Sequence, residues 1–352
     1  MQPDPIASTS TPTAPSFTFA PGALTRVVLA LIAFVALPLL GTDYLFSAVL
    51  VPVLALGIAG LGQNLLTGYA GQLSVGSAAF MSVGAFTAYN VSLRLPGTPL
   101  VLSFLLGGVS AGVVGVLFGL PSLRIRGFYL IVSTLAAQFF VQWVFTKVAW
   151  FSDGSSSGVI SAPKLLVLGH DLSSPRGRYL LTLAFAAGLT WLARNLVHSH
   201  TGRAFMAIRD MDTAAAVIGI PILRTKLLAF AVSSFYLGVA GALWAFTYLG
   251  TVEPHGFDLN RSFQVLFVAI IGGLGSLSGS YLGAAFVVLL PVGLSVLQST
   301  LLADLVSAGL LENLQKILFG TLILLILIKE PEGLRKLFLS LGATLRRRVR
   351  AH

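Results

Sequence analysis

Polar side chains stand between glycines from Gly68 to Phe86, inside a run from 44 to 93 that contains no Asp, Glu, Lys or Arg. Glycine weakens a helix and a buried polar group needs a partner, so this composition indicates a helix that breaks or packs tightly. A broken helix exposes backbone N–H and C=O groups to a cavity, where they can hold a polar solute. Close helix packing through small residues is the alternative. We predict that a solute pathway is lined by Gln72, Ser74, Ser77 and Gln138.

A second glycine-rich stretch, from Ile271 to Phe286, has a similar composition and adds Gly273 and Gly275 to the predicted pathway. Apolar stretches that are interrupted by glycine in opposite halves of a chain are typical of transporters built from two related halves. The two stretches share composition rather than a residue-by-residue repeat, so they do not by themselves establish an inverted repeat.

A polar segment from 198 to 223, called the 198–223 loop, separates the uncharged runs 179–193 and 227–252. The composition from Arg203 to Ile218 predicts one short helix that Gly219 and Pro221 end. Small side chains in its middle would let another backbone approach, and the flanking charges would fix the register of that contact. An ordinary helix on the membrane surface is the alternative. The predicted docking surface consists of Arg203, Arg209, Asp210, Thr213, Ala214, Ala215 and Gly219.

Missing residues exclude several kinds of chemistry. None of the six lysines follows a glycine, so the chain lacks a G-x-x-x-x-G-K-[ST] phosphate loop and we expect no ATP hydrolysis. The absence of cysteine excludes disulfides, thiolate metal sites and iron–sulfur clusters. His198 and His200 have no third ligand nearby, so we expect no metal site. The scarcity of charge within the apolar runs favours energy supplied by a partner over an ion gradient.

Apolar helices must carry these residues. The chain has 352 residues, of which 56% are hydrophobic and 10% charged, and its mean hydropathy is +0.90. A soluble domain has about 25% charged residues, so this chain belongs in a bilayer, where a spanning helix needs about 20 apolar residues. We predict an all-α, polytopic transmembrane bundle of about ten spans with glycine-rich broken helices. The uncharged runs are 27–42, 44–93, 95–123, 127–146, 179–193, 227–252, 262–303 and 317–328.

Basic residues set the predicted orientation. If the 198–223 loop is cytoplasmic, 15 of the 22 Lys and Arg residues lie on the inner side, in agreement with the positive-inside bias. The formal charge of +10 then reflects cytoplasmic loops and anionic headgroups rather than nucleic acid. We expect a disordered cytoplasmic tail at 1–23, a transmembrane domain at 24–334 and a basic cytoplasmic tail at 335–352, with both termini inside.

Five stretches of the sequence resemble one family. They are TGYAGQLSVGSAAFMSVGAFTAY, GRAFMAIRDMDTAAAVIGI, KLLAFAVSSFYLGVAGAL, GGLGSLSGSYLGAAF and KEPEGL, and they span roughly Gly60 to Leu334. In this order they are similar to the LivM-type permease subunits of bacterial ABC importers for branched-chain amino acids. The resemblance implies a protein of the bacterial inner membrane. Relatives carry leucine, isoleucine and valine, but also urea, short amides and other amino acids.

The resemblance also implies partners. They are a paired LivH-type permease, an external solute-binding protein and two cytoplasmic ATP-binding subunits, which would hold the ATP and Mg²⁺. The loop helix would be the coupling helix with the family pattern Glu-Ala-Ala-x-x-x-Gly. Ala214, Ala215 and Gly219 match that pattern, whereas Thr213 replaces its Glu, so Arg209 and Asp210 are the candidate charges for the ATPase. A stand-alone secondary carrier and a structural membrane subunit are the alternative functions.

Overall fold

The computed structural model describes residues 33, 37–124, 129–155, 158–163, 165–167 and 169–301, and the isolated positions 313, 317, 318, 320 and 321. The chain divides after Gly41 into two units. The first contains helix α2, Leu37–Leu40, and everything below concerns the second. The predicted tails at 1–23 and 335–352 lie outside the described residues, as does most of the run 317–328.

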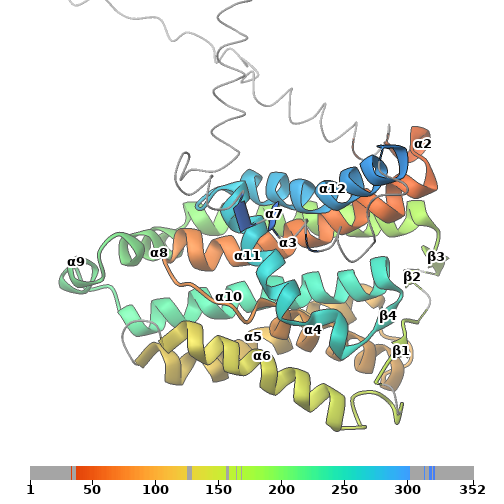
Figure 1. Ribbon diagram of the computed structural model, residues 1–352. Coiled ribbons are helices and arrows are strands. Elements are labelled where there is room, and N and C mark those ends of the chain that lie inside the picture. The colour runs from red at the N-terminus through yellow and green to blue at the C-terminus, as the bar shows by residue number, and fades with distance from the viewer. Residues whose placement is uncertain are drawn as a thin grey trace, which may run out of the picture. The chain divides into compact units, whose positions relative to one another are not determined.

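Helices make up almost all of the described part of the second unit (Figure 1), as the composition predicts. Three π-helical segments, Leu45–Leu50, Leu65–Tyr69 and Trp244–Leu249, extend the ends of α3 and α10. The helices are α3 (Val51–Asn64), α4 (Ser77–Arg94), α5 (Leu100–Arg124), α6 (Tyr129–Lys147), α7 (Pro175–His198), α8 (His200–Asp210), α9 (Asp212–Val217), α10 (Ile222–Leu243), α11 (Leu259–Gly272) and α12 (Leu277–Leu301).

Six helical segments within the described residues are long and apolar enough to cross a bilayer, so a count of ten spans is not confirmed. The 14 residues of α11 rise about 21 Å, which is less than the roughly 30 Å of a bilayer core. The runs 44–93 and 262–303 each hold two helices, but each contains one candidate span within the described residues, so the prediction that each run crosses the membrane twice is not confirmed. The six segments are Leu45–Tyr69, Leu100–Pro121, Tyr129–Lys147, Pro175–His198, Ile222–Leu249 and Leu277–Leu294.

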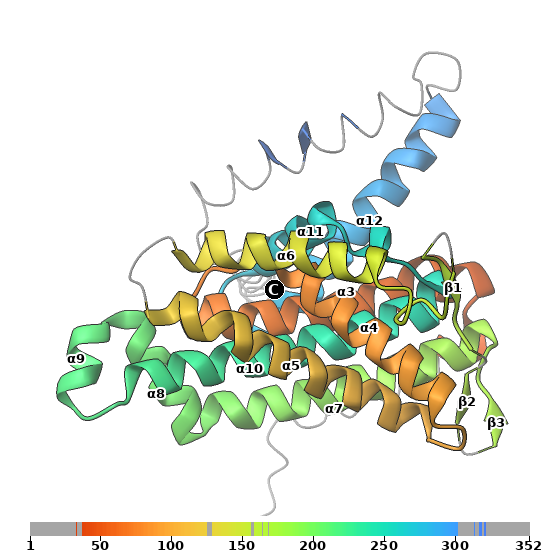
Figure 2. The same ribbon diagram turned by 90° about the horizontal axis from the view of Figure 1, so that it is seen from below.

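The two ends of the bundle differ (Figures 1 and 2). Helices α8 and α9 lie at one end, and short antiparallel strand pairs lie at the other. Strand β1 (Ile160–Ser161) pairs with β4 (Thr251–Val252), and β2 (Leu166–Val167) pairs with β3 (His170–Asp171). The 198–223 loop and the segment before α7 are therefore at opposite ends, as the alternation of spans predicts.

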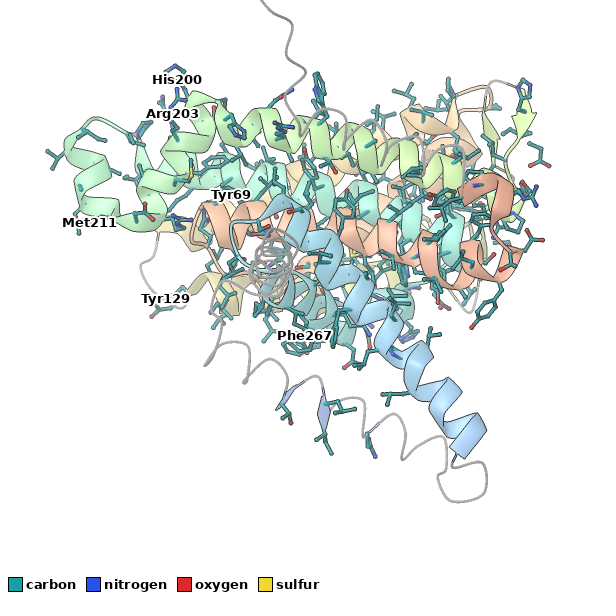
Figure 3. All side chains as sticks on the ribbon, turned by 90° about the horizontal axis from the view of Figure 1, so that it is seen from above. Tyr69, Tyr129, His200, Arg203, Met211 and Phe267 are labelled. Atoms are coloured by element: carbon teal, nitrogen blue, oxygen red, sulfur yellow. The ribbon has the colours of Figure 1, made fainter. Side chains whose placement is uncertain are left out.

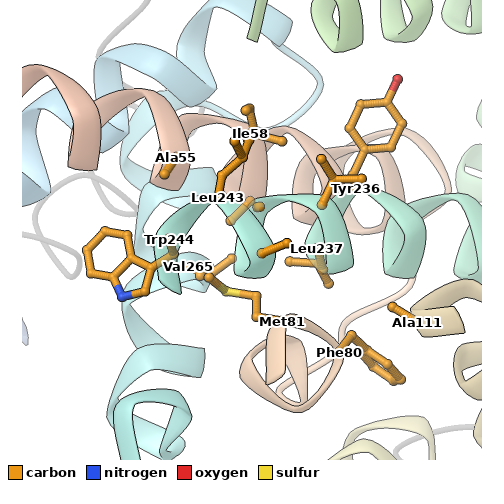
Figure 4. Close-up of a cluster of buried hydrophobic side chains, with 14 of the residues drawn as sticks. Ala55, Ile58, Phe80, Met81, Ala111, Tyr236, Leu237, Leu243, Trp244 and Val265 are labelled. Atoms are coloured by element: carbon orange, nitrogen blue, oxygen red, sulfur yellow. The ribbon is translucent and has the colours of Figure 1, made fainter. Parts of the chain in front are cut away.

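Helices α4, α5 and α10 meet through glycines in the core. A Cβ added to Gly84 would lie 2.1 Å from the Gly238 carbonyl oxygen, and one added to Gly107 would lie 2.5 Å from the Gly84 carbonyl oxygen. Backbones at this separation leave no room for a side chain, so Gly84 serves the close packing that small residues allow. Around this contact α3, α4, α5, α10 and α11 contribute buried apolar side chains, including Ile58 and Met81 (Figure 4).

The outer faces of α5 and α6 are apolar. Val109, Val113 and Leu117 of α5 are more than half exposed, as are Val132, Phe139, Phe140 and Trp143 of α6. An apolar face of this extent is stable against lipid rather than water. The outward residues thus agree with a multi-pass membrane protein.

Candidate functional site

The first glycine-rich stretch is a break between two helices. The π-helical segment Leu65–Tyr69 ends α3, residues 70–76 leave the helix, and α4 begins at Ser77. Gly71 has φ +67°, a conformation that glycine adopts at little cost. The Gln72 N–H returns to the Leu66 carbonyl at 3.0 Å and closes the end of the helix. The predicted broken helix is confirmed at this point of the chain.

Gln63 of α3 holds the break from one side. Its Nε2 donates to the Ser74 carbonyl at 3.0 Å, and its Oε1 accepts from the Ser77 hydroxyl at 2.7 Å. Gln63, Ser74 and Ser77 are buried. The Ser77 hydroxyl that the composition singled out therefore has a hydrogen-bond partner within this one chain, whereas the buried Oε1 of Gln72 has none among the described residues.

Gln138, at the middle of α6, holds the start of α4 from the other side. Its Oε1 accepts from the Ala79 N–H at 2.7 Å and from the Ser262 hydroxyl at 3.0 Å. Its Nε2 donates to the Phe257 carbonyl at 2.7 Å, just before α11. The first turns of α4 and α11 thus meet at one amide halfway along α6, so both helices begin inside the bundle.

The second glycine-rich stretch is the turn between α11 and α12. Gly273 has φ +110° and Gly275 has φ +75°. Asn64 of α3 fastens this turn: its Oδ1 accepts from the Gly275 N–H at 2.8 Å, and its Nδ2 donates to the carbonyls of Gly273 (3.1 Å) and Ser276 (2.9 Å). Its side chain is fully buried. One amide therefore satisfies the Gly275 N–H and the Gly273 carbonyl, and it gives the Ser276 carbonyl a second donor beside the helical Ser280 N–H.

The two breaks touch each other. A Cβ added to Gly68 would lie 2.3 Å from the Gly275 nitrogen and 2.0 Å from Asn64 Oδ1. The sequence pattern placed both stretches on the predicted pathway but did not single out Gln63 and Asn64. Two adjacent amides in an uncharged run were the available signal, because buried amides need partners.

The 198–223 loop contains two helices, so the prediction of one helix from Arg203 is wrong (Figure 3). Helix α8 begins earlier, at His200, because the Ser199 hydroxyl accepts from the Gly202 N–H and caps it. Met211 is extended, at φ −160° and ψ +102°, and separates α8 from α9. Asp210 and Asp212 flank it, and aspartate favours helix ends over helix interiors. The predicted stop is confirmed, since Gly219 has φ +86° and α10 follows Pro221.

The small residues of α9 and of the turn after it differ in exposure. Thr213, Ala214 and Gly219 are exposed, whereas Ala215 is only 2% exposed. The composition did not predict the apolar side chains that extend outward beside them, Val217 (87% exposed) and Ile218 (73% exposed). The outward surface of α9 is therefore both small and apolar.

A family model described as "Branched-chain amino acid transport system / permease component" matches residues 45–327, which is most of the chain. The chain belongs to this permease family. Its relatives are permease components of ABC transport systems, so this permease is a transport subunit and not an enzyme. A permease of such a system works with ATPase and solute-binding subunits. None of the solved structures matches it.

Relatives of this permease include proteins with different cargoes. It is 28% identical to the high-affinity branched-chain amino acid permease LivM of Escherichia coli, over 79% of this chain and 67% of that protein. It is 25% identical to a probable LivM of Methanocaldococcus jannaschii, over 79% and 89%. It is also 28% identical to the autoinducer 2 import permease LsrC of an Enterobacter species, over 72% and 71%.

The arginines of the 198–223 loop make three kinds of polar contact: with the loop's own backbone, with a neighbouring carboxylate and with the end of α3. Arg203 is exposed and donates to the His198 carbonyl at 3.1 Å. Arg209 pairs with Asp210 at 2.8 Å and also donates inward, to the Gly68 carbonyl at 3.0 Å. Among the residues that the structure describes, no three His, Asp or Glu side chains gather to hold a metal ion.

A second contact joins the loop to the first break. Asp212, at the start of α9, pairs with Lys226 of α10. The Lys226 carbonyl accepts from Gln72 Nε2 at 3.2 Å, and Gln72 is 5% exposed. Residues 70–76 are thus held between the loop and the interior of the bundle. The assignment of Gln72, Ser74, Ser77, Gln138, Gly273 and Gly275 to a pathway stays a prediction.

Proposed function

We propose that this permease carries branched-chain or related amino acids across the bacterial inner membrane and is driven by two cytoplasmic ATPase subunits, to which it is coupled through the 198–223 loop. A LivH-type permease would pair with it, an external solute-binding protein would deliver the solute, and ATP and Mg²⁺ would sit on the ATPases. Both termini of the chain would then be cytoplasmic.

The observation that carries the proposal is the exposed tip of α9. Val217, the last residue of α9, and Ile218, which follows it, are strongly exposed. Helix α9 lies at the end of the bundle that is remote from the strands (Figures 1 and 2). Exposed aliphatic side chains that are clustered on a loop mark a contact site for another molecule. The short side chains of Thr213 and Ala214 beside them leave room for the backbone of a partner.

The breaks support a mechanism of alternating access. Closure of the ATPases on ATP would displace the loop, and the helices that end at residues 70–76 and 273–276 would reseat to open the pathway to one side and then the other. A helix that already ends inside the bundle can change its direction while its own backbone hydrogen bonds stay intact, whereas an unbroken span would have to break some of them.

The substrate class rests on the LivM relatives. Competing uptake assays test it, with the purified binding protein and radiolabelled L-leucine challenged by valine, urea, acetamide or ribose. Competition by valine alone is the expected result. Competition by urea or acetamide would assign the chain to amide transport, and competition by ribose to sugar transport.

Docking is tested with Ala216→Trp, because Ala216 is exposed on α9 and its replacement leaves the buried packing of the helix intact. Ala215→Trp is unsuitable, since Ala215 is buried. We expect the two ATPase subunits to co-purify with the unaltered complex and to be lost from Ala216→Trp. If the isolated chain moved leucine into liposomes without ATP, a secondary carrier would replace the proposal.

A further inference from the structure

Arg209 lies where the 198–223 loop meets both glycine-rich breaks. Its Nη1 donates to the Gly68 carbonyl at 3.0 Å, and a Cβ added to Gly275 would lie 3.7 Å from the same nitrogen. A Cβ added to Gly71 would lie 3.0 to 3.3 Å from Cγ, Cα and Cβ of Arg209. Arg209 therefore contacts the end of α3, the extended chain after it and the turn before α12. We call Arg209, Gly68, Asn64 and Gly275 the Arg209 junction.

The Gly68 carbonyl is a suitable acceptor for a guanidinium group. It lies in the last turn of a helix, where carbonyls have no helical N–H partner and carry the negative end of the helix dipole. Arg209 supplies a charge-assisted hydrogen bond, and Asp210 holds the guanidinium through Nε at 2.9 Å and Nη2 at 2.8 Å. The carboxylate thus orients the arginine toward the helix end instead of leaving it free in solvent.

The other side of the junction is rigid. Asn64 lies one helical turn before Gly68 and is bonded to the Gly275 N–H and the Gly273 carbonyl. Gly68 itself touches the Gly275 backbone closely enough to exclude a side chain. A displacement of α8 that moves Arg209 therefore acts on the end of α3 and on the α11–α12 turn together.

We propose that Arg209 is the positioning residue that transmits movement of the 198–223 loop to the two glycine-rich breaks, and that it is not a contact for the ATPase. The inference rests on the proposed docking of ATPase subunits on α9. Arg224, exposed at the start of α10 and outside the predicted docking surface, has no such inward contact in the structure described here. It is the matched control.

The test uses the whole transporter in liposomes and a single thiol. The chain has no cysteine, so Leu274→Cys, in the α11–α12 turn and 42% exposed, labels one site of this subunit. The rate of its reaction with a water-soluble maleimide is measured with and without ATP and vanadate, on the gel band of this chain. ATPase subunits in the purified complex and ATP hydrolysis are measured on the same samples.

We expect ATP to change the labelling rate at least about threefold in the background protein, because labelling reports the population of the displaced turn. Arg209→Met should abolish that change while both ATPase subunits remain bound and hydrolyse ATP, and Arg224→Met should behave like the background. Arg209→Lys keeps the charge and the aliphatic stem but cannot bridge Gly68 and Asp210 at once, so a reduced response with full assembly is expected. This variant carries the test if Arg209→Met does not yield folded permease.

Three outcomes overturn the inference. One is an unchanged ATP response in Arg209→Met, including the case in which only thermal stability falls. Another is loss of the ATPase subunits from Arg209→Met alone, which would make Arg209 a direct contact. The third is a background protein with bound ATPases whose turn does not respond to ATP. A background complex that contains no ATPase subunit would refute the proposed function itself.

Discussion

Replacement of Asn64 by alanine is the sharpest test of how the breaks are held. Its side chain is fully buried, and the Gly275 N–H donates to it at 2.8 Å. Asn64→Ala leaves that N–H without its partner, removes a donor from two carbonyls and opens a space where the side chain packed. An unsatisfied buried polar group costs about 1–3 kcal/mol, so with the lost packing we expect destabilisation of about 3 kcal/mol.

The assay is thermal unfolding followed by intrinsic fluorescence, since the chain has four tryptophans. A loss of this size lowers the midpoint by roughly 5 °C. The matched control is Asn260→Ala, because Asn260 is exposed and its amide donates to Asp258 Oδ2 at 2.7 Å. Surface changes of this kind cost less than about 0.5 kcal/mol, so its midpoint should hardly move.

Asn64→Asp adds a second comparison. It keeps the shape and one acceptor oxygen but turns the donor toward Gly273 and Ser276 into an oxygen that faces two carbonyls. We expect it to be at least as destabilised as the alanine variant. Equal midpoints for Asn64→Ala and Asn260→Ala would refute the argument that one amide secures the turn.

Two further changes test the packing and the loop. Gly84→Val should prevent folding, because a Cβ would lie 2.1 Å from the Gly238 carbonyl oxygen. Gly188→Ala, where a Cβ would meet nothing within 4 Å, should stabilise α7 by up to about 1 kcal/mol. The yields of folded protein and the unfolding midpoints of both variants are measured, and equal behaviour would contradict the close contact at Gly84. The coupling free energy between Lys226→Met and Asp212→Asn in a double-mutant cycle should be less than about 1 kcal/mol, because both side chains are partly exposed. A coupling well above that would mean that this pair is more than a surface contact.

Much of the fold follows from composition, because the bilayer imposes its own length on uncharged runs. The run 44–93 is too long for one span and holds two helices, and glycines mark the break between them. The stop at Gly219 also follows from local conformation, since the position needs a positive φ. These features depend on neighbours in the sequence and on a uniform solvent.

The contacts of the candidate site could not be predicted in the same way. Asn64 and Gly275 are more than 200 positions apart, and their hydrogen bond depends on how α3, α11 and α12 pack. The inward course of Arg209 likewise depends on how α8 lies against the end of α3, because its acceptor, the Gly68 carbonyl, is 141 positions away in the sequence. The sequence identified Arg209 as a charge near small residues, but only the packed bundle gives that charge its acceptor.

The exposed aliphatic side chains at the end of α9 affect how much of this permease accumulates in the cell. A copy that nothing covers presents Val217 and Ile218 to water. Chaperones and proteases bind such aliphatic surfaces, and they remove proteins that keep them exposed. Copies made in excess of whatever occupies the tip would be degraded first, so the number of surviving permeases would follow the abundance of that occupant.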